Sequence, residues 1–396
     1  MHFNKNLALA TAFAVPSSAL ATLYEDHHTS DAVVQGKFIV KMKDAMSTVA
    51  ANEVENLMDT IDYVYNVGSF KGFAGSLDNA ALAAVQAHPS VDYIEREVAV
   101  RASSYVTQHG APWGLGRVSH KGPETFTDGT TYVYDDSAGE GVCAYVIDSG
   151  IRVDHEEFEG RAESLVNFAG GDDEDTFGHG THVAGTIGGA TYGVAKKVSL
   201  YSVKIGQGYE TGLDDEIMTS NVIAGMQFVG NDTRTRHCPN GTVANLSFGL
   251  QHSRAVNDVA KSLLNIGVFV VVATGNEGRD AGFRSPANEP ALCTVGATDK
   301  NNLLANFSNH GPVVDILAPG VDILSASIAN TTASISFNGT SMSAPHVAGL
   351  AACLLASKHL DPKTLCEYMA KTASPLITVL QNNTVNLVAF NGNPEG

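Results

Sequence analysis

The sequence has 396 residues, of which 44% are hydrophobic and 17% are charged. This composition is typical of a globular protein with a sizeable core and excludes a largely disordered chain. The net charge of −18 argues against nucleic acid and anionic membranes as partners, because both need a basic surface. The length allows a large α/β domain together with a smaller domain.

The N-terminus has the pattern of a secretory signal peptide spanning residues 1–21. Lys5 precedes an apolar run over residues 7–15, and Ala19-Leu20-Ala21 is a small-x-small sequence that predicts cleavage after Ala21. Every later candidate for a membrane span is interrupted by glycine or by charged residues. We therefore expect a secreted, extracellular protein with no membrane partner.

The first folded segment is predicted over residues 37–100, after a polar linker over residues 22–36. Strand-like and helical patterns alternate here in the order β-α-β-β-α-β. The strands are predicted at Lys37–Met42, Ile61–Val67, Phe70–Leu77 and Val91–Val100, with one helix reaching Leu57 and the other over Ala80–Ala87. This order predicts a small ferredoxin-like α+β domain. Residues 101–110 lose this periodicity and are predicted to be an exposed linker.

The remainder of the chain is glycine-rich and predicts strands that alternate with helices. The predicted strands are Val142–Ile147, Val198–Lys204, Val243–Phe248, Val268–Ala273, Cys293–Ala297 and Val314–Leu317. The predicted helices are Thr181–Ile187, a segment near Ser220–Val229, Ala255–Leu264 and Met342–Leu355. Continuous apolar strands of this kind indicate an α/β fold with a doubly wound, mostly parallel sheet that is covered on both faces.

Three short segments carry side chains suited to acyl transfer. Asp148 ends a predicted buried strand, at the sheet edge where ligands bind in such folds. His179 precedes a helix, and Ser341 lies where a turn meets an apolar helix whose N–H groups favour negative charge. Each of the three also has an alternative interpretation. Asp148 and Ser341 could be helix caps or turn residues. His179 could form a metal pair with His182, although the HExxH glutamate is absent. The order Asp, His, Ser is one of the three convergent serine-hydrolase arrangements.

Taken together, these segments resemble the three signatures of the subtilase family. The resemblance rests on Asp148-Ser149-Gly150, His179-Gly180-Thr181-His182-Val183-Ala184-Gly185 and Gly339-Thr340-Ser341-Met342. Three further segments narrow it to the proteinase K-like fungal branch: Ala111-Pro112-Trp113-Gly114-Leu115, Gly193-Val194-Ala195-Lys196-Lys197 and Thr384-Val385-Asn386-Leu387. The resemblance covers about residues 105–393. It implies a secreted serine endopeptidase with Ser341 as nucleophile, His179 as general base and Asp148 orienting His179.

The resemblance also implies roles for residues around the nucleophile. Asn276 would donate its side-chain amide to the oxyanion, together with the backbone N–H of Ser341. An extended substrate would pair with Ser247-Phe248-Gly249, and Ala273-Thr274-Gly275 would form the opposite wall of the S1 pocket. Small residues in these walls imply broad specificity with bulky apolar or aromatic P1 side chains. The segment Glu210–Met218 and Arg284 depart from the family pattern and leave the finer subsite preferences open.

A structural calcium site follows from the same resemblance. Pro290 and Leu292 would contribute backbone carbonyls and Asp315 a carboxylate, which are oxygen ligands suited to Ca²⁺. A second site is not supported, because Lys121 and Ile377 stand where relatives have oxygen-bearing side chains. The resemblance implies no cofactor for catalysis.

Five cysteines in an oxidising compartment predict two disulfides and one free thiol, without fixing the pairing. Cys353, which lies in an apolar run, is the best candidate for the unpaired cysteine. The resemblance to the subtilases supplies the pairing: Cys143 with Cys238, and Cys293 with Cys366.

Residues 37–100 resemble the inhibitor-type propeptide of subtilases, which assists folding and then inhibits the peptidase. The resemblance divides the chain into a signal peptide (1–21), a propeptide (22–104) and a peptidase domain (105–396), with self-cleavage between Ala102 and Val106. The implied partners are protein and peptide substrates and the chain's own propeptide, and the enzyme is expected to be a monomer. N-glycosylation sequons on predicted loops begin at Asn231, Asn240, Asn330 and Asn382.

Two other functions are disfavoured by the sequence. A catalytically inactive subtilase-like scaffold is disfavoured because Asp148, His179, Ser341 and Asn276 are all present. An esterase of the α/β-hydrolase type would carry a GxSxG elbow and the order Ser, Asp, His, and neither is found.

Overall fold

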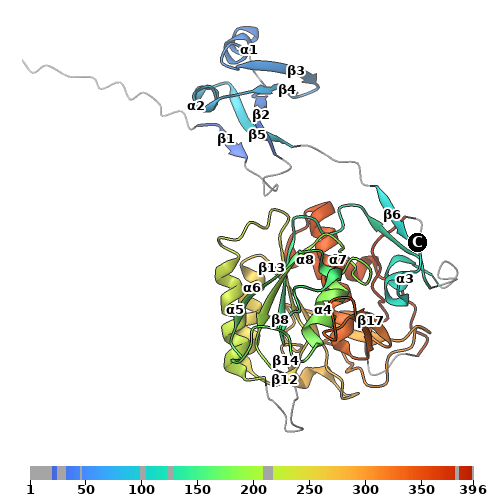
Figure 1. Cartoon of the computed structure of the whole chain (residues 1–396). Coiled ribbons are helices and arrows are strands. Elements are labelled where there is room, and N and C mark those ends of the chain that lie inside the picture. Colours follow the sequence, from blue (N-terminus) through green and yellow to red (C-terminus); the bar gives the residue numbers. More distant parts are fainter. Residues whose placement is uncertain are drawn as a thin grey trace, which may run out of the picture. The chain divides into compact units, whose positions relative to one another are not determined.

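The computed structural model describes residues 20–24, 33–44, 47–98, 104–122, 129–207, 217–379 and 383–394. They form two compact units, one within Met1–Arg101 and one within Ala102–Gly396 (Figure 1). The predicted signal peptide lies outside the described residues up to residue 19, and most of the acidic segment Glu210–Met218 does as well. No helix among the described residues is long and apolar enough to cross a membrane.

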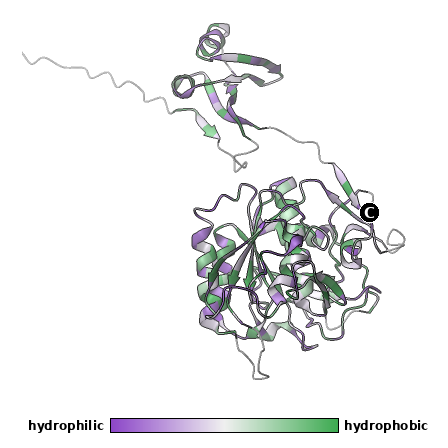
Figure 2. Cartoon of the chain, viewed as in Figure 1, coloured by the Kyte–Doolittle hydropathy of each residue, from purple (hydrophilic) through white to green (hydrophobic). Residues whose placement is uncertain are grey.

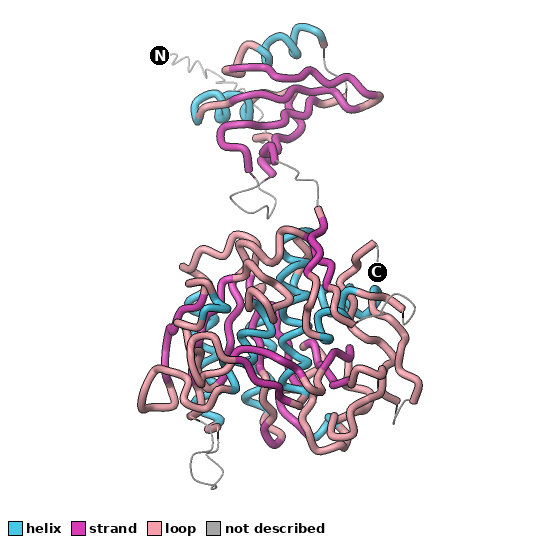
Figure 3. Tube along the Cα trace, turned by 45° about the vertical axis from the view of Figure 1, so that its right-hand side comes forward, coloured by secondary structure: helices cyan, strands magenta, loops and turns pink. Residues whose placement is uncertain are grey.

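The smaller unit contains the predicted β-α-β-β-α-β order. Its elements are β1 (Thr22–Tyr24), β2 (Val33–Met42), α1 (Thr48–Glu55), β3 (Thr60–Val67), β4 (Phe70–Ser76), α2 (Asn79–Ala87) and β5 (Val91–Val98). The sheet order is β1-β5-β2-β4-β3, and both helices bury a valine, Val54 and Val85, in the core beneath the sheet. Figure 3 shows the strands of this sheet side by side.

The predicted linker over residues 22–36 was wrong at both of its ends. Strand β1 pairs with β5 in parallel, and β2 already begins at Val33. Ala21 is buried in the core of this unit, and its N–H donates to the carbonyl of Gln86 at 2.8 Å. The polar character of this segment gave no sign of this short edge strand, whose Leu23 also packs against the core.

The larger unit is built on a seven-stranded parallel sheet, which confirms the predicted fold class. Its strands, in spatial order, are β16 (Ile316–Pro319), β15 (Cys293–Thr298), β13 (Val268–Ala273), β11 (Thr242–Leu246), β8 (Cys143–Asp148), β10 (Ser199–Lys204) and β9 (Ala162–Asn167). All six predicted strands are present; β13 has the predicted ends, and the ends of the other five differ by a few residues. The edge strand β9 was missed because Ala162–Asn167 is partly polar and partly exposed, without the continuous apolar run of the other strands.

Helices cover both faces of this sheet. Helices α4 (His179–Gly188) and α7 (Thr340–Lys358) lie on one side of β8 and β13, and α5 (Thr219–Asp232) and α6 (Arg254–Asn265) lie on the other (Figure 1). Along β8, Ala144 and Val146 pack into the first core while Tyr145 and Ile147 pack into the second. Burial on both faces explains the continuous apolar strands, whose hydropathy Figure 2 shows.

Smaller elements complete the larger unit. They are β6 (Tyr105–Gln108), α3 (Trp113–Ser119), β7 (Tyr132–Asp135), η1 (Glu156–Phe158), β12 (Leu250–Gln251), η2 (Ala281–Phe283), β14 (Arg284–Ser285), β17 (Ile323–Ala326), β18 (Ser334–Phe337) and α8 (Pro362–Thr372). Strand β6 pairs with β7, so the predicted linker over residues 101–110 was wrong for this stretch. Its pairing partner β7 is distant in sequence, so the residues of β6 alone do not predict a strand.

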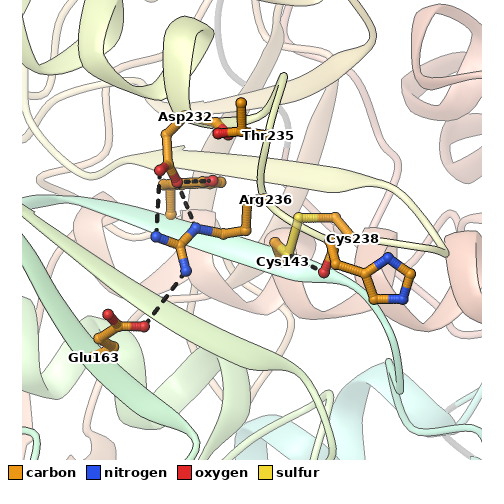
Figure 4. The surroundings of a disulfide bond; sticks show 8 residues. Cys143, Glu163, Asp232, Thr235, Arg236 and Cys238 are labelled. Atoms are coloured by element: carbon orange, nitrogen blue, oxygen red, sulfur yellow. Dashed lines mark hydrogen bonds and ion pairs between the residues drawn. A yellow bond between two sulfur atoms is a disulfide. The ribbon is translucent and has the colours of Figure 1, made fainter.

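The structure contains both expected disulfides, Cys143–Cys238 and Cys293–Cys366, and leaves Cys353 unpaired and half-buried in α7. Figure 4 shows the surroundings of the first bridge, where Arg236 binds Asp232 and reaches Glu163 at 3.4 Å. The hydroxyl of Tyr145 donates to the same Asp232 at 2.6 Å. These contacts join the end of α5 to β8 and β9, at the sheet edge opposite Asp148.

Candidate active site

Five chain segments meet at the carboxyl edge of the parallel sheet. Strand β8 ends at Asp148, β11 is followed by Ser247, and β13 is followed by the segment that carries Asn276. Helix α4 begins at His179, and Ser341 lies in the first turn of α7. Ligands bind at this edge in open α/β sheets, because here the loops after several strands converge.

Asp148 and His179 form a hydrogen-bonded pair. The Nδ1 atom of His179 lies 2.8 Å from Oδ1 of Asp148, which also accepts the N–H of Ser149 at 2.8 Å. A glycine allows this approach: a Cβ on Gly180 would lie 2.1 Å from the carbonyl oxygen of Gly150. The helix start can therefore rest directly on the turn that follows Asp148.

The environment of His179 sets its protonation. Burial by itself would lower the pKa of His179, but the charge and hydrogen bond of Asp148, joined by the charge of Asp175, raise the pKa above its usual value. The ring of Phe177 stacks on the imidazole, with centroids 6.2 Å apart. This pairing favours the imidazolium that forms when His179 takes up a proton.

His182 is held differently and does not face the same centre. Its Nε2 donates to the carbonyl of Ile323 at 2.8 Å, and its ring stacks on Phe337. Burial lowers the pKa of His182 to about 4. Among the described residues, no group of three or more potential metal ligands includes His179 and His182, so the structure gives no support to a metal pair of these histidines.

Ser341 exchanges two hydrogen bonds with Ser247. Its Oγ donates to the Ser247 carbonyl at 2.9 Å, and the Ser247 hydroxyl donates to the Ser341 carbonyl at 2.8 Å. No hydrogen bond between Ser341 and His179 is present within the described residues. Transfer of the Ser341 proton to His179 therefore needs a rotation about χ1, which a bound substrate can select, since nucleophile–base contacts often tighten only in the complex.

The orientation of the Asn276 amide follows from its partners. Its Oδ1 accepts both the N–H and the hydroxyl of Thr340, at 2.8 Å and 2.9 Å. The amide nitrogen is thereby left to face the cavity beside Ser341. Ser341 lies in the first turn of α7, where N–H groups have no partner within the helix, so its backbone can offer a second kind of donor beside the Asn276 amide.

A cavity of about 380 Å³ opens at this point. It is lined by Phe177, His179, Asn276, Phe337, Asn338, Ser341 and Met342. The proposed base, nucleophile and amide donor thus share one cavity, whose remaining walls are mainly apolar. This combination of a few polar groups with apolar walls is typical of a substrate site.

The two predicted walls of the S1 pocket meet an ion pair. Arg284 binds Glu277, the residue after Asn276. A Cβ on Gly249 would lie 3.9 Å from Cδ of Arg284, and a Cβ on Gly275 would lie 2.9 Å from the Glu277 carboxylate. The side chain of Arg284, which departs from the family pattern, thus lies between the two predicted walls.

Sequence reasoning missed three residues that shape this site: Thr340, Asn309 and Asp175. Thr340 orients Asn276, and the side-chain amide of Asn309 donates to the carbonyl of Thr274 at 2.9 Å and to Glu277 at 2.6 Å. Asp175 binds the start of α4. Thr340 lies inside one of the subtilase motifs, but the acidic run around Asp175 resembles a solvated loop and gives no signal.

The three residues predicted to bind calcium lie near the Cys293–Cys366 bridge. Burial raises the pKa of the Asp315 carboxyl to about 6, although the N–H of Thr294 donates to its Oδ2 at 2.8 Å. Asp315 forms no salt bridge within the described residues. A half-buried carboxylate and backbone carbonyls, as Asp315, Pro290 and Leu292 would offer, are oxygen ligands of the kind that Ca²⁺ takes.

The glycosylation candidates differ in their surroundings. Asn231 is exposed but lies in the last turn of α5 rather than on a loop, and Asn330 lies in an exposed turn. The Nδ2 atom of Asn240 already donates to the Glu140 carbonyl at 2.7 Å. Asn382 lies outside the described residues.

A parallel sheet that brings an Asp–His pair, a serine at a helix start and an oriented amide to one edge has the features of a serine hydrolase. Comparison with known proteins sharpens this class. Residues 139–391 match the Subtilase family, and residues 22–103 match the Peptidase inhibitor I9 family. The chain belongs to the subtilase family, in its proteinase K-like fungal branch, and is a serine endopeptidase made with an inhibitor-type propeptide.

Individual relatives match over most of the chain. It is 47% identical over 366 residues to a cuticle-degrading protease of Metarhizium anisopliae, covering 92% of this chain and 91% of that protein. It is 46% identical to proteinase R of Parengyodontium album, covering 91% and 89%. The crystal structure of a cold-adapted subtilisin-like serine proteinase matches with a TM-score of 0.64 and 36% identity, covering 71% of this chain and 98% of that one.

Proposed function

We propose that Ser341, His179 and Asp148 are the catalytic triad of this endopeptidase, with Asn276 and the Ser341 N–H as the oxyanion hole. The observation that carries the proposal is the orientation of Asn276, whose oxygen is held by Thr340 so that its amide nitrogen faces the cavity of Ser341 and His179. A hydrogen-bond donor that is fixed in this orientation is suited to bind the negative charge that develops on the carbonyl oxygen.

The reaction then follows from the positions of these groups. Ser341 Oγ attacks the peptide carbonyl while His179 Nε2 takes its proton, and Asp148 stabilises the imidazolium through Nδ1. The carbonyl oxygen becomes an oxyanion bound by Asn276. His179 then protonates the leaving amine. In the second half of the reaction, His179 takes a proton from a water molecule, which attacks and hydrolyses the acyl-enzyme.

Substrate binding is proposed for the segments on either side of the nucleophile. An extended peptide would pair with Ser247-Phe248-Gly249, and Ala273-Thr274-Gly275 would form the facing wall. The glycines in these walls support a slot for bulky apolar or aromatic P1 side chains. The ion pair between Glu277 and Arg284 adds charge between the walls and is proposed to limit the depth of that slot.

The enzyme is proposed to be secreted and monomeric, and the segments before the peptidase domain are proposed to serve its export and maturation. A signal peptide (residues 1–21) would direct export, and a propeptide (22–104) would assist folding, inhibit the enzyme and be removed by it, leaving the peptidase domain (105–396). The asparagines proposed to carry glycans are Asn231, Asn240, Asn330 and Asn382, of which exposed Asn231 and Asn330 have the strongest support.

A calcium ion is proposed to bind Asp315 with the carbonyls of Pro290 and Leu292. Subtilases generally bind calcium and need no cofactor for catalysis. Bound there, the ion would supply structural stability by neutralising the Asp315 carboxylate. It would hold the loop before β15 close to the Cys293–Cys366 bridge.

The proposed specificity is tested by a cleavage profile on a peptide library. Purified enzyme and a Ser341→Ala variant are incubated with the library, and the cut peptides are identified by mass spectrometry. We expect cuts after apolar and aromatic residues with the enzyme and none with the variant. Cuts without any P1 preference would contradict the pocket assignment, and cuts by the variant would contradict the nucleophile.

A further inference from the structure

Asp175 is a buried carboxylate beside the proposed triad that the reaction above does not use. Only 5% of its surface is exposed. Its Oδ1 accepts the Ser149 hydroxyl at 2.9 Å, the Phe177 N–H at 3.1 Å and the Gly178 N–H at 2.8 Å. Its Oδ2 accepts the N–H and hydroxyl of Thr181, at 2.9 Å and 2.6 Å. Within the described residues it has these five donors and no salt bridge.

The five donors come from both segments that hold the Asp148–His179 pair. Ser149 follows Asp148 directly, and its own N–H donates to the Asp148 carboxylate at 2.8 Å. The hydroxyl of Ser149 also accepts the N–H of Gly180, the residue after His179, at 3.0 Å. Asp175 therefore connects the end of β8 to the start of α4 through a single side chain.

The loop before Asp175 is itself fixed from the sheet. Lys204, fully buried at the end of β10, donates through Nζ to the carbonyls of Asp172 at 2.7 Å and Glu174 at 2.6 Å. In the register of β10 and β8, Lys204 lies opposite Asp148. A Cβ on Gly150 would lie 3.1 Å from Cα of Asp175, so the loop packs directly on the turn after Asp148.

We propose that Asp175 is a positioning residue that sets His179 against Asp148 and holds a second fixed negative charge beside the imidazolium formed in the reaction. This inference rests on the proposed roles of His179 and Asp148. A simple helix cap would need only the donors on α4; the bond to Ser149, which leads to Asp148, is the feature that a cap does not require.

The charges around His179 agree with this assignment. Asp148 faces it from β8 and Asp175 from the preceding loop, while His182 lies on the same helix. Burial lowers the pKa of His179, and the two carboxylates raise it. Because the general base must be neutral, removal of the Asp175 charge moves the acid limb of kcat/KM to lower pH.

The test is the substitution Asp175→Asn in the full-length precursor, followed by kinetics of the mature enzyme. Asparagine keeps the shape but turns a hydrogen-bond donor toward groups that already donate. We expect kcat to fall about 10- to 100-fold, as for small misplacements of catalytic groups, with KM changed less than about twofold. We also expect the acid limb of kcat/KM to move to lower pH. Rates are expressed per active site titrated with a fluorophosphonate, so that misfolded protein does not lower the measured kcat.

Two companion variants separate positioning from stability. Asp361 caps α8 through the N–H of Lys363 at 2.9 Å, outside the cavity that holds Ser341 and His179, so Asp361→Asn is expected to keep both kcat and the acid limb. Ser149→Ala removes the hydroxyl that joins Asp175 to the end of β8 and to Gly180 but leaves the other four donors to Asp175, and a smaller fall in kcat per titrated site is expected. If Asp175→Asn does not mature, Ser149→Ala decides the question.

Two results would contradict the inference, and a third would contradict the proposed function on which it rests. An Asp175→Asn enzyme with the wild-type kcat per titrated site and an unmoved acid limb would leave Asp175 as a helix cap only. A Ser149→Ala enzyme with unchanged kcat would show that the bond between Asp175 and Ser149 does not position His179 against Asp148. Wild-type protein that hydrolyses no peptide would instead contradict the proposed function.

Discussion

The side-chain oxygen of Asn276 accepts two hydrogen bonds from Thr340, and its nitrogen, which has no partner among the described residues, is available to bind the oxyanion. We therefore predict that Asn276→Ala lowers kcat by about 10²–10³, the size of the loss known for the corresponding change in subtilisin, and leaves KM nearly unchanged. Thr340→Val removes one of the two bonds that orient Asn276, and a fall of about three- to tenfold is expected. Equal losses of kcat and substrate affinity would show that Asn276 binds the ground state instead.

His179 carries the pH dependence at the residue scale. Its pKa is raised because Asp148, with Asp175, outweighs the effect of burial. Since only the neutral imidazole accepts the Ser341 proton, kcat/KM is predicted to fall at acid pH with a midpoint above the usual histidine pKa. Asp148→Asn is expected to lower kcat by about 10⁴. A midpoint near pH 4 would instead match the lowered pKa of His182.

At the scale of elements, most of the large sheet could be predicted because its strands are buried on both faces. Val268–Ala273 is an unbroken apolar run, and the structure starts and ends β13 at those residues. Short elements such as β6 and β1 were missed, because their place depends on partners distant in sequence. Site residues within the subtilase motifs were found, whereas Asn309 and Asp175 are defined only by the folded contacts they make.

The loop before β15 gives a prediction about calcium. Burial raises the pKa of Asp315 to about 6, so in the metal-free protein the ionised carboxylate is disfavoured and this group's contribution to stability falls as pH rises through about 6. Calcium needs that ionised carboxylate and reverses the loss. We predict that added calcium raises the Tm more at about pH 8 than at about pH 5, measured by calorimetry in buffers treated with chelator.

The control for this prediction is Asp315→Asn, in which the response to calcium is expected to vanish at both pH values. An equal calcium effect on the wild type and on this variant would place the ion elsewhere. The comparison needs no measurement of activity.

At the scale of the whole molecule, the start of the peptidase unit limits where the propeptide can be cut. Strand β6 begins at Tyr105, and the carbonyl of Ser104 already accepts the N–H of Asp136 at 2.9 Å. A cut after Tyr105 would remove the first residue of β6 and its pairing with Asp135 of β7. Within the proposed window from Ala102 to Val106, we therefore predict a mature N-terminus no later than Tyr105, which agrees with a propeptide that ends at residue 104.

Maturation is predicted to depend on Ser341 in the same molecule. Ser341→Ala should be secreted as an unprocessed precursor, while the wild type loses the residues that precede the peptidase domain. Mass spectrometry of the secreted proteins measures both the mass and the N-terminus. Normal maturation of the variant would mean that another protease removes the propeptide.

The central claim is that Ser341 is a nucleophile activated by His179. Its most direct test is to label the mature enzyme with a fluorophosphonate and to locate the adduct by peptide mass spectrometry. We predict one adduct, on Ser341, that forms rapidly in the wild type, slowly in His179→Ala and not at all in Ser341→Ala. Labelling at another serine, or labelling of Ser341 at the same rate without His179, would contradict the account.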